Sequence, residues 1–96
     1  MLAEQAVERP KRDDMVVIND DSEVPSLLLP MTGKIFVTNR VGVRVVQLAD
    51  GSHTSEEIVD RIVEQFQGAE KTVVGREVAA FLDAGTKKGL ITWTRS

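Results

Sequence analysis

Cysteine and tyrosine are absent from this 96-residue chain, and histidine and tryptophan each occur once. Without cysteine there is no disulfide framework, no thiolate nucleophile and no zinc–thiolate site. The one histidine, His53, has no second histidine or cysteine with which to form a metal site or a catalytic pair, and its polar surroundings predict a solvent-exposed turn residue. We therefore expect a chain without catalytic activity, bound metal or other cofactor.

Long apolar runs are also missing. Runs such as residues 27–29 are far too short to span a membrane, and the N-terminus lacks the apolar core of a signal peptide. The formal net charge of −3 argues against nucleic acid as the main partner, because phosphate binding depends on clustered Lys and Arg. We expect a soluble, cytoplasmic protein that is a monomer or a weak homodimer.

The first 14 residues carry scattered charges around Pro10 and few apolar residues, which predicts a mobile N-terminal arm. A short amphipathic helix over residues 2–7 is an alternative for part of this arm, although so short a helix is marginal alone. The remaining chain, residues 15–93, has the apolar content of one compact domain.

Three extended segments open this domain. Residues 15–18 and 24–29 flank a dense turn signal, and a second turn containing Gly33 precedes a third strand over residues 34–38. The pattern predicts a three-stranded antiparallel meander. The third strand has apolar side chains on both faces, so it is either buried on both faces or leaves one face or its edge available to a partner.

Three helices follow the strands. The first covers residues 41–48, the second begins after Thr54 in a capping box with Glu57 and reaches residues 67–68, and the third covers residues 72–88. A short extended tail containing Leu90, Ile91 and Trp93 should pack on the core. The predicted fold class is α+β, a three-stranded antiparallel sheet followed by three helices, similar to a winged helix-turn-helix.

Several short motifs occur in a fixed order between residues 15 and 91. They are Asn39, Gly42, Asp50–Gly51, Thr54, Glu57–Ile58–Val59, Phe66, Glu77–Val78, Phe81–Leu82 and Gly89–Leu90–Ile91. Together their order and spacing resemble the PqqD family of small peptide-binding proteins. Thr38, Val46 and Gly85 are smaller than the residues expected at those positions, which predicts a smaller core.

The resemblance implies a recognition element for ribosomally made, later modified peptides. Such a protein is a non-catalytic peptide chaperone that binds the leader of a precursor as an added strand and presents it to a maturation enzyme of the radical-SAM or cyclase type. The implied binding strand comprises Lys34, Ile35, Phe36, Val37 and Thr38, beside a cleft bounded by the third helix. Two flanks of that helix could face the cleft, one with Gly75, Ala79 and Thr86 and the other, which we favour, with Val73, Glu77, Ala80, Ala84 and Lys88.

Two other functions fit the same pattern. A winged-helix DNA-binding regulator would read DNA with the third helix through Arg76, Lys87 and Lys88, although Glu77 and Asp83 lie on that helix and the chain is acidic. A structural module without a ligand would instead pair its exposed sheet edge with a second copy.

Overall fold

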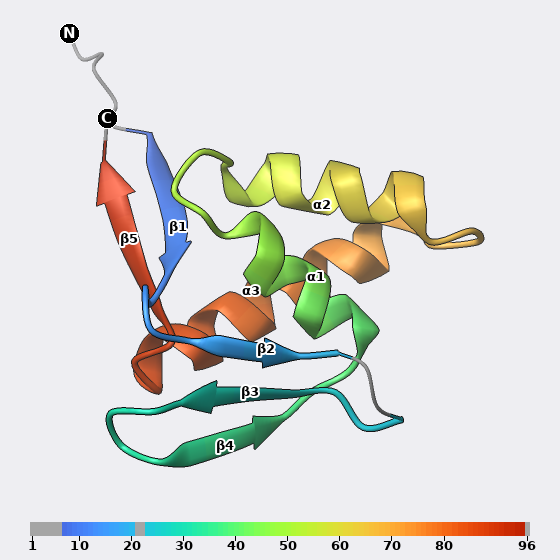
Figure 1. Cartoon of the computed structure of the whole chain (residues 1–96). Coiled ribbons are helices and arrows are strands. Elements are labelled where there is room, and N and C mark those ends of the chain that lie inside the picture. The colour runs from blue at the N-terminus through green and yellow to red at the C-terminus, as the bar shows by residue number, and fades with distance from the viewer. Residues whose placement is uncertain (1–6, 21–22, 96) are drawn as a thin grey trace, which may run out of the picture.

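The computed structural model describes residues 7–20 and 23–95, and its elements form an α+β fold (Figure 1). One antiparallel sheet contains β2 (Val17–Asn19), β3 (Ser26–Leu29) and β4 (Lys34–Val37). A second pairs β1 (Glu8–Arg12) with β5 (Ile91–Arg95). Beside them lie α1 (Arg40–Leu48), α2 (Ser55–Gln65) and α3 (Lys71–Lys87). The predicted meander and three helices are therefore present, and the predicted extended tail forms β5. The strand β1 and its pairing with β5 were not predicted.

The three-stranded sheet has the order β2-β3-β4, which makes β4 an edge strand. Its register places Phe36 opposite Leu27 and Ile35 opposite Leu28. Leu27 is buried and Phe36 is half-buried against the helices, whereas Ile35 and Val37 are exposed. Of the two possibilities for this strand, the structure has the one in which a face and an edge remain open.

The predicted mobile arm is wrong for residues 8–12, which form β1 and pair with β5. Pro10 is fully buried opposite Trp93. Arg12 Nη1 donates hydrogen bonds to the carbonyl oxygens of Val46 and Gln47, at 3.2 and 3.1 Å, at the end of α1. The strand is ordered because its backbone pairs with β5 and its side chains contact the helical layer. The helix considered for residues 2–7 lies largely outside the described residues.

The chain turns from β4 into α1 at Asn39. The Asn39 side chain accepts a hydrogen bond of 2.8 Å from the N–H of Gly42 and so caps the helix. Val45, Val46 and Leu48 are buried, and this packing holds a helix whose many valines have low helical propensity. The helix ends at a turn in which Gly51 has a φ of +87°, a conformation that favours glycine.

The second helix begins with the predicted capping box. Thr54 Oγ1 accepts from the N–H of Glu57 at 3.2 Å, and Glu57 Oε1 accepts from the N–H of Thr54 at 2.8 Å. Phe66 is the C-cap, so Gly68, with a φ of +81°, lies in the turn beyond it. α3 then runs back alongside α2, and the two helices pack as a hairpin.

Gly85, where a larger residue was expected, leaves no gap beside α3. A Cβ atom at this position would lie 2.8 Å from Ile91 Cγ1, so Ile91 already fills the space beside α3. The helices and sheet enclose one apolar core, formed by Leu27, Leu29, Val45, Val46, Leu48, Ala49, Ile58, Val59, Ile62, Val74, Val78, Leu82, Leu90 and Ile91. Among the described residues, no helix has the length and apolar character needed to cross a membrane.

Candidate functional site

Within the described part of the chain, no strand pairs with the outer edge of β4, so backbone groups there are open to a partner. The N–H of Thr38 donates to the carbonyl oxygen of Pro25 at 2.9 Å, so Thr38 faces β3. Successive residues of a strand direct their N–H and C=O groups to opposite sides. Ile35 and Val37 therefore direct theirs away from β3. The two residues are 65% and 71% exposed, and together they present two donors and two acceptors to an added strand.

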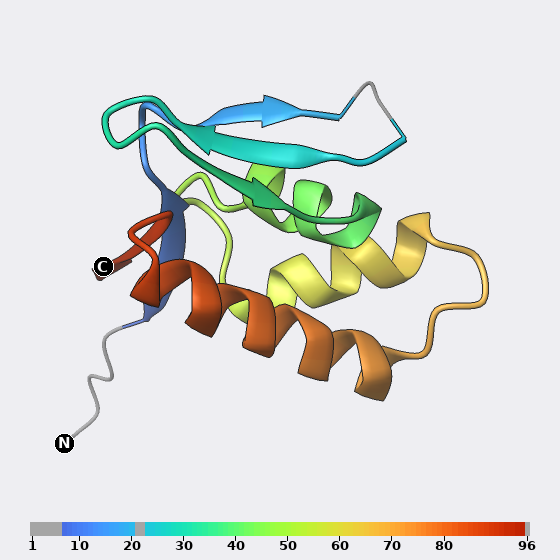
Figure 2. The same cartoon turned by 90° about the horizontal axis from the view of Figure 1, so that it is seen from below.

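A hollow of about 270 Å³ lies between β4 and α3, and we call it the β4–α3 cleft. Figure 2 shows β4 on the side of its sheet that faces α3. The small residues Ala84 and Gly85 leave space on the α3 side of the cleft, while Phe36 and Phe81 provide aromatic surface. The cleft is lined by Leu27, Phe36, Val37, Thr38, Asn39, Phe81, Ala84, Gly85, Lys88 and Leu90.

One end of the cleft carries a positive charge. Lys88 Nζ lies over the Phe36 ring, 5.3 Å from its centroid, which is within the range of a cation–π contact. This contact draws the ammonium group from α3 toward β4. A carboxylate on a bound peptide could pair with the ammonium at this end of the cleft.

The cleft continues along α3 into a second hollow of about 350 Å³. The two share Asn39 and Phe81, and the second adds Val41, Gly42, Glu77 and Ala80. Gly42 is required by close approach, because a Cβ atom there would overlap Thr38 Oγ1 and lie 2.9 Å from Phe81 Cε2. A continuous surface thus runs along α3, with a cation toward one end and a carboxylate toward the other.

The ten residues that the sequence assigned to peptide binding are placed as follows. Phe36, Val37, Thr38, Ala84 and Lys88 line the β4–α3 cleft, and Glu77 and Ala80 line its continuation. Lys34, Ile35 and Val73 line neither hollow, although Lys34 and Ile35 belong to the edge strand.

Sequence reasoning missed Asn39 and Phe81, which line both hollows. A signal for Phe81 was its position on α3, four residues after Glu77 and three before Ala84, which places it on the same flank. Asn39 directly follows the edge strand and belongs to the turn into α1, so it lies at the end of the same wall.

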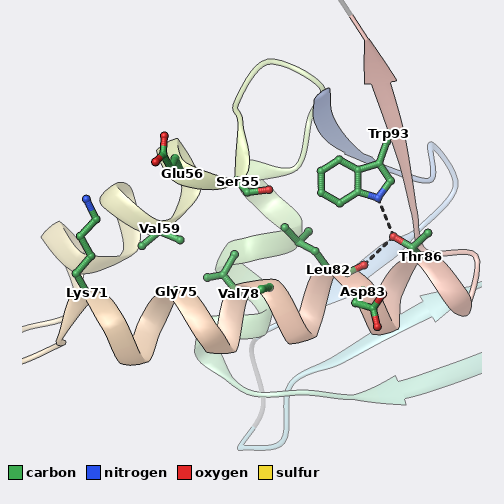
Figure 3. Close-up of a pocket in the computed structure, with 11 residues that line it drawn as sticks. Ser55, Glu56, Val59, Lys71, Gly75, Val78, Leu82, Asp83, Thr86 and Trp93 are labelled. Atoms are coloured by element: carbon green, nitrogen blue, oxygen red, sulfur yellow. Dashed lines mark hydrogen bonds between the residues drawn. The ribbon is translucent and has the colours of Figure 1, made fainter. Parts of the chain in front are cut away.

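The other flank of α3 faces α2 and forms a larger hollow of about 490 Å³, which we call the α2–α3 groove (Figure 3). Its walls include Gly75, Ala79 and Thr86, the flank that the sequence analysis did not favour. The complete lining is Ser55, Glu56, Val59, Lys71, Gly75, Val78, Ala79, Leu82, Asp83, Thr86 and Trp93. The two flanks of α3 therefore line separate hollows.

The polar turn after α1 is structural. His53 is half-buried rather than solvent-exposed as predicted, and its Nδ1 lies 3.0 Å from the Leu48 carbonyl oxygen and 3.2 Å from Asp50 Oδ1. The Ser52 hydroxyl donates to Asp50 Oδ1 at 2.6 Å, and this hydrogen bond, with the Ser52 N–H and His53 adding to it, lowers the pKa of Asp50 to about 2. The N–H of Thr54 likewise lowers the pKa of Glu57. Both carboxylates are thus held ionised by contacts that shape a turn and a helix start.

Metal ligation is not supported within the described residues, where no three His, Cys, Asp or Glu side chains form a group that could hold an ion. The arrangement offers backbone groups at a sheet edge and apolar surface in the adjoining cleft, which suit recognition of a peptide.

Comparison with known proteins gives a family and two solved structures. The family described as "Coenzyme PQQ synthesis protein D (PqqD)" matches residues 14–91. A search of the curated proteins found no match. The structure of "TbiB1 in Complex with the TbiA(beta) Leader Peptide" is 32% identical with a TM-score of 0.68, and the match covers 84% of this chain and 93% of that one.

A second structure, "Lasso peptide synthetase B1 complexed with the leader peptide", has a TM-score of 0.70 at 15% identity. The match covers 88% of this chain and 98% of that chain. At this identity the similarity shows a shared fold.

Proposed function

Because the chain belongs to the PqqD family, we propose that it captures the leader of a ribosomally made precursor peptide as an added strand on β4 and presents it to a maturation enzyme. The observation that carries this proposal is the free edge of β4, where Ile35 and Val37 direct their backbone groups outward beside the β4–α3 cleft. The 32%-identical structure supports it, because that protein is in complex with a leader peptide.

Backbone pairing alone is too weak to hold a leader. The four backbone groups of Ile35 and Val37 contribute a net ~0.5–1.5 kcal/mol each, so together less than the roughly 8 kcal/mol of a micromolar complex. Ordering the peptide costs a further 1–2 kcal/mol per residue, roughly. Leader side chains buried in the cleft must supply the difference, at about 1.5–3 kcal/mol for each large apolar residue.

The shape of the cleft indicates which leaders fit. Side chains of an added strand alternate between the two faces of the sheet, so every second leader residue faces α3. Apolar or aromatic residues at those positions would contact Phe36 and Phe81 above the small Ala84. An acidic residue near the same end would pair with Lys88. We therefore expect leaders with alternating apolar anchors and a nearby carboxylate.

The role proposed here is non-catalytic and cytoplasmic. The protein would bind and present the leader, and the partner would carry out the modification, with a radical-SAM enzyme or a cyclase as the expected partner class. A short precursor gene and a gene for such an enzyme beside the gene for this chain would agree with this role.

The charges on α3 argue against DNA binding. The basic residues suggested for DNA contact lie beside acidic ones on α3, where Lys87 pairs with Asp83 at 3.3 Å. Lys88 contacts Phe36 in the β4–α3 cleft and so is not directed toward Lys87 or Arg76 as part of a basic surface. The proteins of similar structure are described with leader peptides.

Matched substitutions at Ile35 test the proposal. Ile35→Pro removes a donor from the free edge and leaves a carbonyl group of the added strand unpaired, so it should weaken binding of a leader peptide at least about fivefold. The fold should persist because proline is tolerated on edge strands. Ile35→Ala keeps the N–H and removes only an exposed side chain that lies outside the cleft, so it should bind within about threefold of the parent, since exposed substitutions change free energies by about 0.5 kcal/mol. Isothermal titration calorimetry measures both.

A second substitution tests the cleft separately from the strand. Ala84→Trp places a large side chain in the cleft without changing β4 and should block the leader side chains that bind there. Circular dichroism and thermal melting confirm that each variant is folded. If Ile35→Pro and Ala84→Trp are both folded and bind the leader like the parent, strand addition at this site is refuted.

A further inference from the structure

The α2–α3 groove is an apolar hollow that the proposed capture of a leader does not use. Its floor consists of Val59, Val78 and Leu82, and Trp93 stands at one end (Figure 3). The indole Nε1 donates to Thr86 Oγ1 at 2.9 Å, and this hydroxyl donates to the Leu82 carbonyl oxygen at 2.7 Å. Trp93, 37% exposed, is thus held in place as an aromatic surface of the kind enriched at protein interfaces.

The walls of the groove determine the backbone conformation of an occupant. α2 and α3 satisfy their own backbone hydrogen bonds, so the walls offer few main-chain partners. An extended peptide buried there would leave its N–H and C=O groups unpaired, whereas a helix satisfies its own. Along α3 the lining runs from Lys71 to Thr86, about 22 Å at 1.5 Å per residue, which matches a helix of about four turns.

Small residues allow such a helix to approach closely. Ala79 is exposed on the α3 wall, and a Cβ atom added at Gly75 would meet no atom within 4 Å. Close approach lets the apolar side chains of a partner reach Val59 and Val78 between the two helices.

The charges around the groove favour a basic occupant. Glu56 and Asp83 lie on its rim, and α2 carries four carboxylates, those of Glu56, Glu57, Asp60 and Glu64, against one guanidinium. The lining itself has the carboxylates of Glu56 and Asp83 against one ammonium group, that of Lys71. Lys71 pairs with Asp60 at 3.1 Å and Lys87 with Asp83 at 3.3 Å, and because both pairs are exposed and weak, cations of a partner can still gain from these carboxylates. Cations on a partner would also gain from the exposed face of Trp93.

We propose that the α2–α3 groove docks a basic amphipathic helix of a partner protein, with apolar residues on Val59, Val78 and Leu82 and cations facing Glu56 and Asp83. The groove and the β4–α3 cleft lie on opposite flanks of α3 and share no lining residue. Both sites can therefore be occupied at the same time. The identification of the partner as the maturation enzyme rests on the proposed function, whereas the preference for a basic helix rests on the groove alone.

A synthetic helix serves as the probe: a peptide of about 18 residues, long enough to be helical, with Leu on one face and Lys on the other. Its control has Glu in place of every Lys. Because Trp93 is the only tryptophan in the chain, its fluorescence reports directly on the groove. The Lys peptide should shift the emission of Trp93 saturably, and the Glu peptide should not.

Two neighbouring alanines provide matched variants. Ala79 lines the groove and Ala80 lines the continuation of the cleft, and both are exposed. Ala79→Phe should weaken binding of the Lys peptide at least about tenfold and leave leader binding unchanged, whereas Ala80→Phe should do the reverse. The two ligands should not compete for the parent protein.

The proposal about the groove is overturned if the Lys peptide does not bind saturably, if the Glu peptide binds equally, or if Ala79→Phe binds the Lys peptide like the parent. It is also overturned if light scattering shows a dimer that Ala79→Phe dissociates, because the groove then binds a second copy. Failure of the leader to bind the parent would contradict the proposed function alone, since the groove assay does not depend on it.

Discussion

Gly42 and Gly75 are both helical glycines, but they meet different surroundings. A Cβ atom at Gly42 would overlap Thr38 and press on Phe81, so this glycine lets β4, α1 and α3 approach at the cleft. A Cβ atom at Gly75 would meet nothing within 4 Å. At Gly42 the absent side chain is needed for packing, whereas at Gly75 only the backbone entropy of glycine opposes folding.

Replacing each glycine by alanine should therefore change stability in opposite directions. Gly42→Ala overpacks the cleft wall, and a cost of about 1–3 kcal/mol should exceed the small gain in helix propensity. Gly75→Ala should raise the free energy of unfolding by about 0.5–1 kcal/mol. Urea denaturation measures both. An equal rise for the two variants would show that the close approach at Gly42 is not real.

The Asp50 carboxylate should make stability depend on pH in a defined window. Its pKa is lowered from 3.8 to about 2, chiefly by the Ser52 hydroxyl, so its contribution is fully present above pH 3.8 and is lost as pH falls through about 2. The side chain is 42% exposed, and solvent screening limits the contribution to less than about 1 kcal/mol.

Asp50→Asn isolates this effect, because it removes the charge and keeps an oxygen that can accept from Ser52. The parent should exceed the variant in free energy of unfolding at pH 5, and the difference should shrink as pH falls toward 2, at which half of the parent carboxylate is protonated. A difference that stays constant between these two values would contradict the assignment.

At the scale of elements, local patterns in the sequence predicted most of the fold. The predicted turn at residues 30–33 separates β3 from β4, and Thr54 and Glu57 mark the start of α2. β1 was not predicted because the segment ERPKR has no apolar alternation and contains proline. Its pairing partner, β5, lies about 80 residues further along the chain, beyond the reach of local patterns.

The candidate site was predictable to a similar extent. The helical spacing that joins Glu77, Ala80, Ala84 and Lys88 on one flank of α3 is visible in the sequence, and these residues line the cleft and its continuation. The sequence left two flanks of α3 open, and the choice between them was a preference, because the flank that faces β4 depends on how α3 packs against the sheet. It also did not predict that Ile91 would fill the space beside Gly85.

β1 should contribute to stability through Arg12 as well as through its backbone. The last turn of α1 has no basic residue of its own, and the guanidinium of Arg12 supplies a positive charge and donors to two of its carbonyl groups. Arg12→Ala should therefore lower the free energy of unfolding by about 1 kcal/mol.

Lys11→Ala is the matched control on the same strand. Lys11 forms an exposed ion pair with Asp14, 3.5 Å apart, and its loss should change the free energy of unfolding by less than about 0.5 kcal/mol. Equal effects of the two substitutions in urea denaturation would rule out the cap that β1 provides for α1.

At the scale of the whole molecule, α3 separates two surfaces of different chemistry. On one flank, the free edge of β4 offers backbone groups beside the β4–α3 cleft, which suits an extended peptide. On the other, two helices enclose an apolar groove with acidic residues on its rim, which suits a helix. The two proposals together place one polypeptide on each side of α3, an arrangement suited to bringing a peptide and a partner protein together.

Amide hydrogen exchange, followed residue by residue with and without the leader, tests the central claim most directly. Strand addition predicts that the amides of Ile35 and Val37 exchange rapidly in the free protein and become protected when the leader binds, because only then are their N–H groups paired. The amides of Phe36 and Thr38, already directed toward β3, should change far less. If the exchange rates of the Ile35 and Val37 amides stay the same when the leader is bound, strand addition on β4 is contradicted.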